Sequence, residues 1–274
     1  MKMFRCSLLV LIFFLHLLAV RGQSDQIPAH DSTEIFSVVL SENRKINIWV
    51  PPDYTTRMDS YPVLYMLDGG INEDFPHIAN TVSQLIMENK IPKLILVGIP
   101  NTTRRLDLTG ETQIASDRKI APKVGGSAAF RKFINDELFP MISKKYRVKA
   151  ERGIIGESLA GLFITETFLT APEMFDFYIA MDPSLWWNDH YLVKNAQLFL
   201  EKLPDSPKRF WFAGSSAKDI YRYTDRLAGI LNKSHLPALQ WFYSREKNEQ
   251  HSTIFKATKE KALIWAFQST RSAH

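Results

Sequence analysis

Apolar and polar residues alternate along residues 34–50, on both sides of a polar break at residues 41–44. A period of two is typical of strands that bury one face, and a polar break between two such runs predicts an antiparallel hairpin. Two continuous apolar runs follow, YPVLYML at 61–67 and KLILVGI at 93–99, and each ends in a turn sequence. Runs of this kind indicate strands buried on both faces, as in a parallel sheet.

Strand patterns and helical patterns then alternate to the end of the chain. Further strands are predicted at 153–156, 176–182, 209–214 and 239–244, with helices at 78–89, 127–145, 162–170, 195–202, 223–232 and 253–267. This alternation predicts an α/β protein with a mostly parallel central sheet, helices on both faces and the hairpin at its amino-terminal edge. In such sheets ligands bind beyond the carboxyl ends of the strands. Residues 101–126 are the longest expected loop.

The amino terminus has the pattern of a secretory signal. Lys2 and Arg5 precede a largely apolar run of thirteen residues at 8–20, which is followed by the small residue Gly22. A helix that crosses a bilayer needs roughly 20 apolar residues, so we expect no stable membrane anchor. The pattern predicts a cleaved signal at residues 1–22, a single domain at 23–274, and a secreted or periplasmic protein.

Charge and cysteine content exclude several classes of function. Residues 1–22 contain three basic and no acidic residues, so their removal lowers the net charge from +5 to +2. This balance does not favour a nucleic-acid partner. The single cysteine, Cys6, lies inside the signal, and the chain has neither a CxxC pair nor an HExxH motif. We therefore expect no disulfide, no metal site and no cofactor.

The strongest chemical signal is GESLAG at 156–161, directly after a predicted strand and before a helix. Small residues on both sides of Ser158 permit the tight turn that exposes a nucleophilic hydroxyl. The first backbone N–H groups of the next helix, that of Leu159 foremost, could stabilise an oxyanion. The motif predicts a serine nucleophile in an α/β-hydrolase fold; the alternative is a tight turn with an exposed serine.

A serine nucleophile needs a base, and in this fold the chain order is serine, acid, histidine. His251 lies between the last predicted strand and the closing helix, where the base is expected. His190, His235 and His274 also follow Ser158 but lie elsewhere in the predicted order.

The acid is less sharply defined by the sequence. Asp219 lies in the loop after the strand at 209–214, from which it could orient the imidazole of His251. Other acidic residues nearby are Asp225, Glu246 and Glu249, and a dyad without an acid is also open.

The second oxyanion donor is expected from the DGG turn at 68–70, and we assign it to the N–H of Gly70. These glycines could also serve only to form the turn.

Several ordered motifs together resemble the esterase-D-like branch of the α/β hydrolases, which includes siderophore esterases, feruloyl and acetyl esterases and antigen-85-type acyltransferases. These motifs are LYMLDGG at 64–70, NTTRRLDLT at 101–109, GESLAGL at 156–162, DPSLWWN at 182–188 and QHSTIFKATKEKAL at 250–263.

The resemblance implies a small-molecule ester substrate. Nothing recognisable as a large lid is inserted between the predicted strands, so we expect an open site. We expect substrate-binding roles at Asp68, Asn101, Arg104, Glu157, Trp186 and Trp187, and Asp107 belongs to the same motif loop as Asn101 and Arg104. Glu157 stands where the family commonly has histidine, and Asp182 where it commonly has serine; both lie near the expected substrate.

We therefore expect a secreted serine esterase, with a siderophore or carbohydrate ester as its substrate. Two alternatives are an acyltransferase with the same catalytic groups, and a binding protein without turnover that presents Trp186 and Trp187 to a ring.

Overall fold

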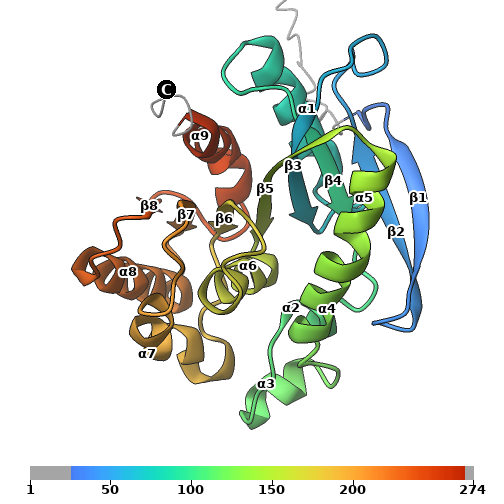
Figure 1. The fold of residues 1–274 in the computed structure, drawn as a ribbon. Helices are drawn as coiled ribbons and strands as arrows, with labels where there is room; N and C mark the ends of the chain where they lie inside the picture. Colours follow the sequence, from blue (N-terminus) through green and yellow to red (C-terminus); the bar gives the residue numbers. More distant parts are fainter. Residues whose placement is uncertain (1–25, 269–274) are drawn as a thin grey trace, which may run out of the picture.

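The computed structural model describes residues 26–268, so the expected signal at residues 1–22 lies outside the described residues. One eight-stranded sheet runs through the molecule in the order β1-β2-β4-β3-β5-β6-β7-β8 (Figure 1). The strands are β1 (Asp31–Ser37), β2 (Glu42–Trp49), β3 (Tyr61–Leu67), β4 (Ile95–Ile99), β5 (Val148–Glu157), β6 (Phe177–Met181), β7 (Lys208–Gly214) and β8 (Leu239–Arg245). The predicted amino-terminal hairpin is confirmed, since β1 and β2 pair antiparallel, and β3 to β8 are mutually parallel.

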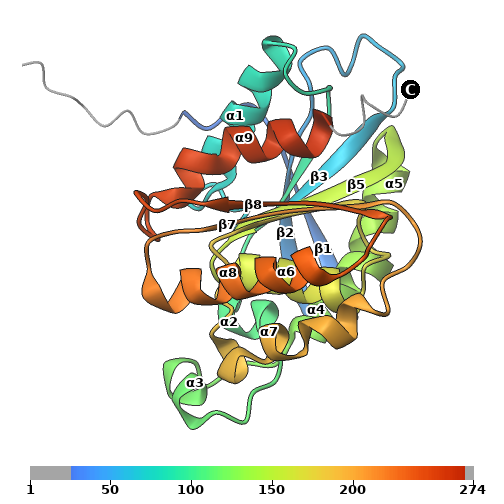
Figure 2. The same cartoon turned by 90° about the vertical axis from the view of Figure 1, so that its left-hand side faces the viewer.

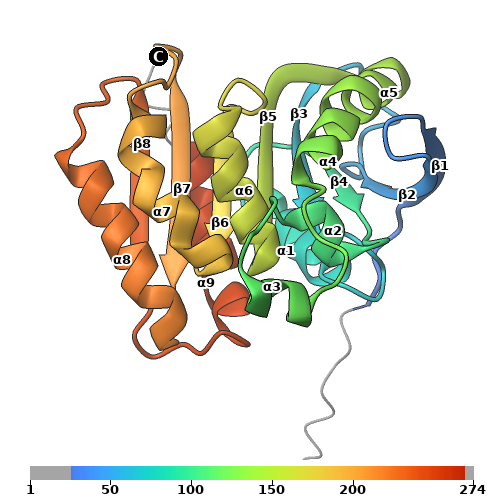
Figure 3. The ribbon, with the colours of Figure 1, turned by 90° about the horizontal axis from the view of Figure 1, so that it is seen from below.

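Helices cover both faces of the sheet, as the alternating pattern predicts (Figure 2). They are α1 (Phe75–Met87), α2 (Arg104–Leu108), α3 (Ala115–Ile120), α4 (Ser127–Phe133), the π-helical turn η1 (Ile134–Leu138), α5 (Phe139–Lys145), α6 (Leu159–Thr170), α7 (Trp187–Leu200), α8 (Lys218–Lys233) and α9 (Ile254–Gln268). Helices α1 and α9 pack on one face, and α4, α6, α7 and α8 lie in front of the other face in Figure 3. Two apolar cores result, one on each side of the sheet.

The predicted loop at 101–126 contains the two short helices α2 and α3. Tertiary contacts hold α3 there, because the buried carboxylate of Asp117 accepts hydrogen bonds from the Thr112 hydroxyl (2.7 Å) and from the backbone N–H of Asn188 (3.0 Å). Asn188 is distant along the chain, so the local pattern could not indicate the helix. In the residues that the structure describes, no helix is long and apolar enough to cross a membrane.

Strand register brings the chemistry to one edge. In the parallel pair β5–β6, Glu157 lies opposite Met181, so the next residues, Ser158 and Asp182, leave the sheet side by side. Met181 in turn lies opposite Ala213 of β7, whose chain continues to Ser215. Three neighbouring strands therefore deliver their carboxyl-terminal residues to the same place, which is the position where open parallel sheets bind ligands.

Candidate active site

Ser158 occupies a tight turn between β5 and α6. Its φ of +61° lies in the region that non-glycine residues rarely adopt. Two backbone hydrogen bonds to the β6 side hold the turn, from Ser158 N–H to Met181 O (2.9 Å) and from Ser184 N–H to Ser158 O (3.0 Å). Strain of this kind persists only where the surroundings enforce it, and it is typical of functional sites.

The small residues around Ser158 are required by space. A Cβ on Gly156 would lie 2.6 Å from the Cβ of Ala160, and one on Gly161 would lie 2.8 Å from the carbonyl oxygen of Met181. Both approaches are closer than real Cβ contacts, so a larger residue at 156 would collide with α6, and one at 161 would push α6 away from the end of β6. This geometry explains why the motif takes the form Gly-Glu-Ser-Leu-Ala-Gly.

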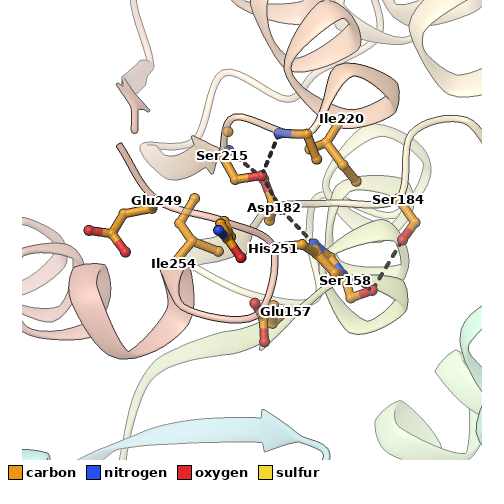
Figure 4. A network of polar contacts seen from close by, with 12 residues as sticks. Glu157, Ser158, Asp182, Ser184, Ser215, Ile220, Glu249, His251 and Ile254 are labelled. Carbon is orange, nitrogen blue, oxygen red and sulfur yellow. Dashed lines mark hydrogen bonds and ion pairs between the residues drawn. The ribbon is translucent and has the colours of Figure 1, made fainter. Parts of the chain in front are cut away.

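His251 lies beside the Ser158 hydroxyl, in the loop between β8 and α9. Its Nε2 is 3.0 Å from Ser158 Oγ, and its Nδ1 is 2.6 Å from Asp182 Oδ2 (Figure 4). The three side chains thus form one continuous chain of hydrogen bonds. The hydrogen bond to Asp182 is the main cause that raises the pKa of His251, partly offset by burial of the ring.

Asp182 is held as a fully buried acceptor at the end of β6. Its side chain is 0% exposed, and it accepts hydrogen bonds from the backbone N–H of Ser215 (2.6 Å) and from the Ser215 hydroxyl (2.8 Å). Its backbone has a φ of +45° and donates to Ala213 O at 3.1 Å. Two donors of Ser215, directly after β7, therefore hold the carboxylate that orients the histidine.

The prediction that Asp219 orients His251 is wrong, because Asp182 makes that hydrogen bond. Asp219 is exposed in the first turn of α8 and contributes only the weakest of the causes that raise the pKa of His251. The physical reason is strand order: β6 lies next to the nucleophile's strand, whereas Asp219 follows β7, one strand further away.

The other acidic residues considered from the sequence bind elsewhere. Asp225 accepts from the Tyr243 hydroxyl, Glu246 pairs with Lys261, and Glu249 accepts from Thr253. The sequence did contain a signal for Asp182. It directly follows an apolar strand, and it is one of the two departures from the family's motifs.

The two expected oxyanion donors differ in their surroundings. The N–H of Leu159 lies at the first position of α6, where a helix offers its N–H groups no intrahelical acceptor. The N–H of Gly70 donates to the carboxylate of Glu73 at 2.7 Å. A negatively charged oxygen already lies on this amide, so Glu73 must turn aside before a substrate oxygen can use it.

Asp68, Asn101 and Arg104, three residues expected to bind substrate, form one hydrogen-bonded group. Arg104 donates two hydrogen bonds to Asp68, from Nε at 2.6 Å and from a terminal nitrogen at 2.7 Å. Asn101 Nδ2 donates to Asp68 Oδ1 at 2.5 Å. Asn101 Nδ2 also donates to Glu73 Oε1 at 2.8 Å. Asp107 lies apart from this group, buried against Arg44 at 2.7 Å. The network joins the loop after β4 to the turn after β3.

Glu157 lies immediately before the nucleophile and is half-buried, and Figure 4 shows it near His251 and Ser158. Its Oε1 is buried without a hydrogen-bond partner. Burial raises the pKa of Glu157 to about 7; the charge of His251 opposes this rise, and the carboxylates of Asp74, Asp182 and Asp68 add to it. A carboxyl group that titrates near neutrality therefore lies beside Ser158.

The two tryptophans have different surroundings. Trp187 is only 6% exposed, and its indole Nε1 donates to Gly110 O at 2.9 Å. This hydrogen bond holds the loop after α2. Trp187 and Leu162 also line a cavity of about 260 Å³. Trp186 is partly buried against the core, with its ring centroid 5.9 Å from that of Trp187. Of the pair, Trp186 has more surface to offer a ligand.

The arrangement of Ser158, His251 and Asp182 provides a nucleophile, a base within reach of its proton, and a buried anion that orients the base. Within residues 26–268, no group of three or more His, Cys, Asp or Glu side chains is placed to hold a metal ion.

Comparison with known proteins identifies the family. Residues 37–267 match the family model described as putative esterase. The chain belongs to this esterase family. The resemblance inferred from the motifs is thereby confirmed, and so is the predicted fold class.

Members of the esterase family that resemble the chain include named siderophore esterases. The ferri-bacillibactin esterase BesA of Bacillus subtilis is 31% identical over 58% of this chain, and the match spans 61% of BesA. The apo-salmochelin esterase of Escherichia coli is 25% identical over 81% of this chain and 74% of its own length.

Among solved structures, an IroE-like serine hydrolase from Shewanella oneidensis superimposes with a TM-score of 0.79 at 26% identity. That superposition covers 88% of this chain and 80% of the other.

Proposed function

We propose that the chain is a serine esterase that hydrolyses carboxylic esters through an acyl-enzyme. The observation that carries this proposal is the hydrogen-bonded chain from Ser158 Oγ through His251 to the buried Asp182. Membership of the esterase family supports the choice of ester bonds over other acyl bonds. The names of the relatives support a siderophore ester as the substrate class. The signal pattern at residues 1–22 adds the proposal that the enzyme acts outside the cytoplasm.

The chemistry follows from the geometry. Ser158 Oγ attacks the ester carbonyl carbon while its proton passes to His251 Nε2, and Asp182 stabilises the imidazolium that forms. The N–H group of Leu159 receives the oxyanion of the tetrahedral intermediate, and the N–H group of Gly70 joins it once Glu73 has turned aside. The intermediate then collapses: the carbonyl to leaving-oxygen bond breaks, and His251 returns the proton to the departing alcohol. Water repeats the sequence on the acyl-enzyme, releases the acid and restores Ser158.

The direct test is hydrolysis of short p-nitrophenyl esters by the wild type, Ser158→Ala and His251→Ala. We expect both variants to remain folded and to lose at least about a thousandfold in kcat, because nucleophile and base act as one unit. A fluorophosphonate should label the wild type and should not label Ser158→Ala. Turnover by Ser158→Ala at the wild-type rate would refute the assignment of the nucleophile, and an unlabelled, inactive wild type would favour a binding protein.

A further inference from the structure

The charged groups around Ser158 are unevenly divided. The carboxylates that act on Glu157 or on Arg104 are those of Asp68, Glu73, Asp74 and Asp182. They lie in the turns after β3 and β6, and Glu157 is the last residue of β5, at the edge where the nucleophile emerges.

Two basic side chains accompany these carboxylates, and both are engaged; His251 is a third group that carries positive charge when it is protonated. The guanidinium of Arg104 makes its two hydrogen bonds to Asp68. The ammonium of Lys259 lies 3.4 Å from His77 Nδ1, and the other ring nitrogen of His77 lies 3.1 Å from Asp74. These carboxylates therefore outnumber the basic groups around the site, even when Glu157 and His251 are both protonated.

Glu157 has a carboxyl oxygen whose hydrogen-bonding capacity is unused. Its Oε1 is buried and lacks a hydrogen-bond partner, although the residue directly precedes the nucleophile. Because this oxygen is buried, the ionised side chain acts on a ligand through its charge and not through a direct hydrogen bond. A cationic group nearby would be stabilised, whereas a carboxylate or another anion would be repelled.

Glu73 strengthens the same bias. Its carboxylate lies on the N–H of Gly70 and also accepts from Asn101. An anionic group that approaches this amide meets a negative charge already in place, and both charges act in surroundings of lower dielectric than water.

We infer that this site selects neutral or cationic esters over anionic ones, with Glu157 as the residue that sets the preference. The inference rests on the proposed esterase function and narrows its substrate class. For siderophores it favours metal-free ligands and uncharged ferric hydroxamates. It disfavours ferric tris-catecholates, in which three doubly charged ligands leave the complex anionic.

The test uses three p-nitrophenyl esters with acyl chains of similar length. One acyl chain is neutral (butyrate), one ends in a carboxylate (succinate) and one ends in a trimethylammonium group. The leaving group is constant, and values of kcat/KM are divided by the rates of hydroxide hydrolysis to remove intrinsic reactivity. The assays are run well above the pKa of about 7 that burial gives Glu157, so that the side chain is ionised.

We compare the wild type with Glu157→Gln and with Glu34→Gln. The control makes the same chemical change at an exposed position on β1, at the far edge of the sheet from β6. We expect the wild type and Glu34→Gln to prefer the cationic over the anionic ester. Glu157→Gln should reduce that ratio about tenfold, as expected for removal of one charge at close range. An equal ratio in all three proteins would overturn the inference.

Salt dependence gives a second measurement that needs no variant. In the wild type, added salt should raise kcat/KM for the anionic ester and lower it for the cationic ester, because screening weakens both interactions. Opposite or absent trends would contradict the inference. Failure of the proposed function has a different signature: the neutral ester would then not be hydrolysed, or would be hydrolysed equally by Ser158→Ala.

Discussion

Replacing Asp182 by asparagine tests the most specific feature of the site. The side chain keeps its shape, but it loses its charge and one acceptor oxygen. In the wild type the carboxylate accepts from three donors: His251 Nδ1 at 2.6 Å, Ser215 N–H at 2.6 Å and the Ser215 hydroxyl at 2.8 Å. An amide has one oxygen for these partners, so its NH₂ group must face at least one of them.

If the NH₂ group faces His251, the imidazole must offer Nδ1 as an acceptor and carry its proton on Nε2. That tautomer cannot take the proton of Ser158. We therefore expect kcat to fall by about 10³ to 10⁴, as expected for loss of the correct tautomer. This loss corresponds to about 4 to 5.5 kcal/mol of transition-state stabilisation.

The assay is kcat/KM for a neutral p-nitrophenyl ester as a function of pH, with Asp219→Asn as the matched control. Activity needs a neutral His251, so kcat/KM falls as the pH drops through the pKa of this residue. Asp182 is the largest cause that raises this pKa, so the acid limb of Asp182→Asn should move to lower pH. Asp219→Asn should stay within about twofold of the wild type, because an exposed charge has a small effect.

The assigned role of Asp182 is refuted if Asp219→Asn loses as much activity as Asp182→Asn, or if Asp182→Asn keeps a tenth of the wild-type rate. Thermal unfolding of Asp182→Asn distinguishes a change of the His251 tautomer, which leaves the melting temperature high, from loss of the folded structure. Ser215→Ala provides a milder variant, because it removes the hydroxyl donor at 2.8 Å and keeps the carboxylate and the backbone donor. We expect its loss of kcat to be about tenfold.

Two further predictions concern the scaffold. A Cβ on Gly69 would lie 2.2 Å from the backbone nitrogen of Ile99, so Gly69→Ala should destabilise the protein by about 3 kcal/mol or more in urea unfolding. Gly229→Ala in α8 is its control, because nothing lies within 4 Å of the added methyl group. The higher helix propensity of alanine should stabilise the protein by about 1 kcal/mol. Equal changes in the free energy of unfolding of the two variants would contradict the close packing of Gly69. Trp187→Phe removes the hydrogen bond to Gly110 O, so the free energy of unfolding should fall by about 1 to 3 kcal/mol. An unchanged free energy of unfolding would mean that this hydrogen bond does not hold the loop.

The sequence predicts most strongly what a local pattern determines. Strands β3 and β4 are buried on both faces, so their apolar runs are continuous and easily recognised. The turn at Ser158 is recognisable because packing against β6 admits only small neighbours. The start of α6 is placed too late by the pattern, at residue 162, because its first turn at Leu159 belongs to the nucleophile turn as much as to the helix.

What the sequence leaves open depends on spatial order. Asp182 and Asp219 both follow apolar strands, and nothing in either segment shows which strand lies beside β5. The distinction appears only when β6 pairs with β5 and brings Asp182 level with Ser158. The kink at 188–190 inside α7 and the short helix α3 likewise depend on contacts between distant segments, such as the bond from Asn188 N–H to Asp117.

The backbone bonds between the turns after β5 and β6 have a consequence for how the site can change. Ser158 is bonded to Met181 and Ser184 on either side of Asp182, so nucleophile and acid form a single rigid block. His251 belongs to a separate loop, and 44% of its side chain is open to solvent. Protein engineers could therefore shorten or stiffen this loop to adjust the base, while the other two members of the triad stay in their positions.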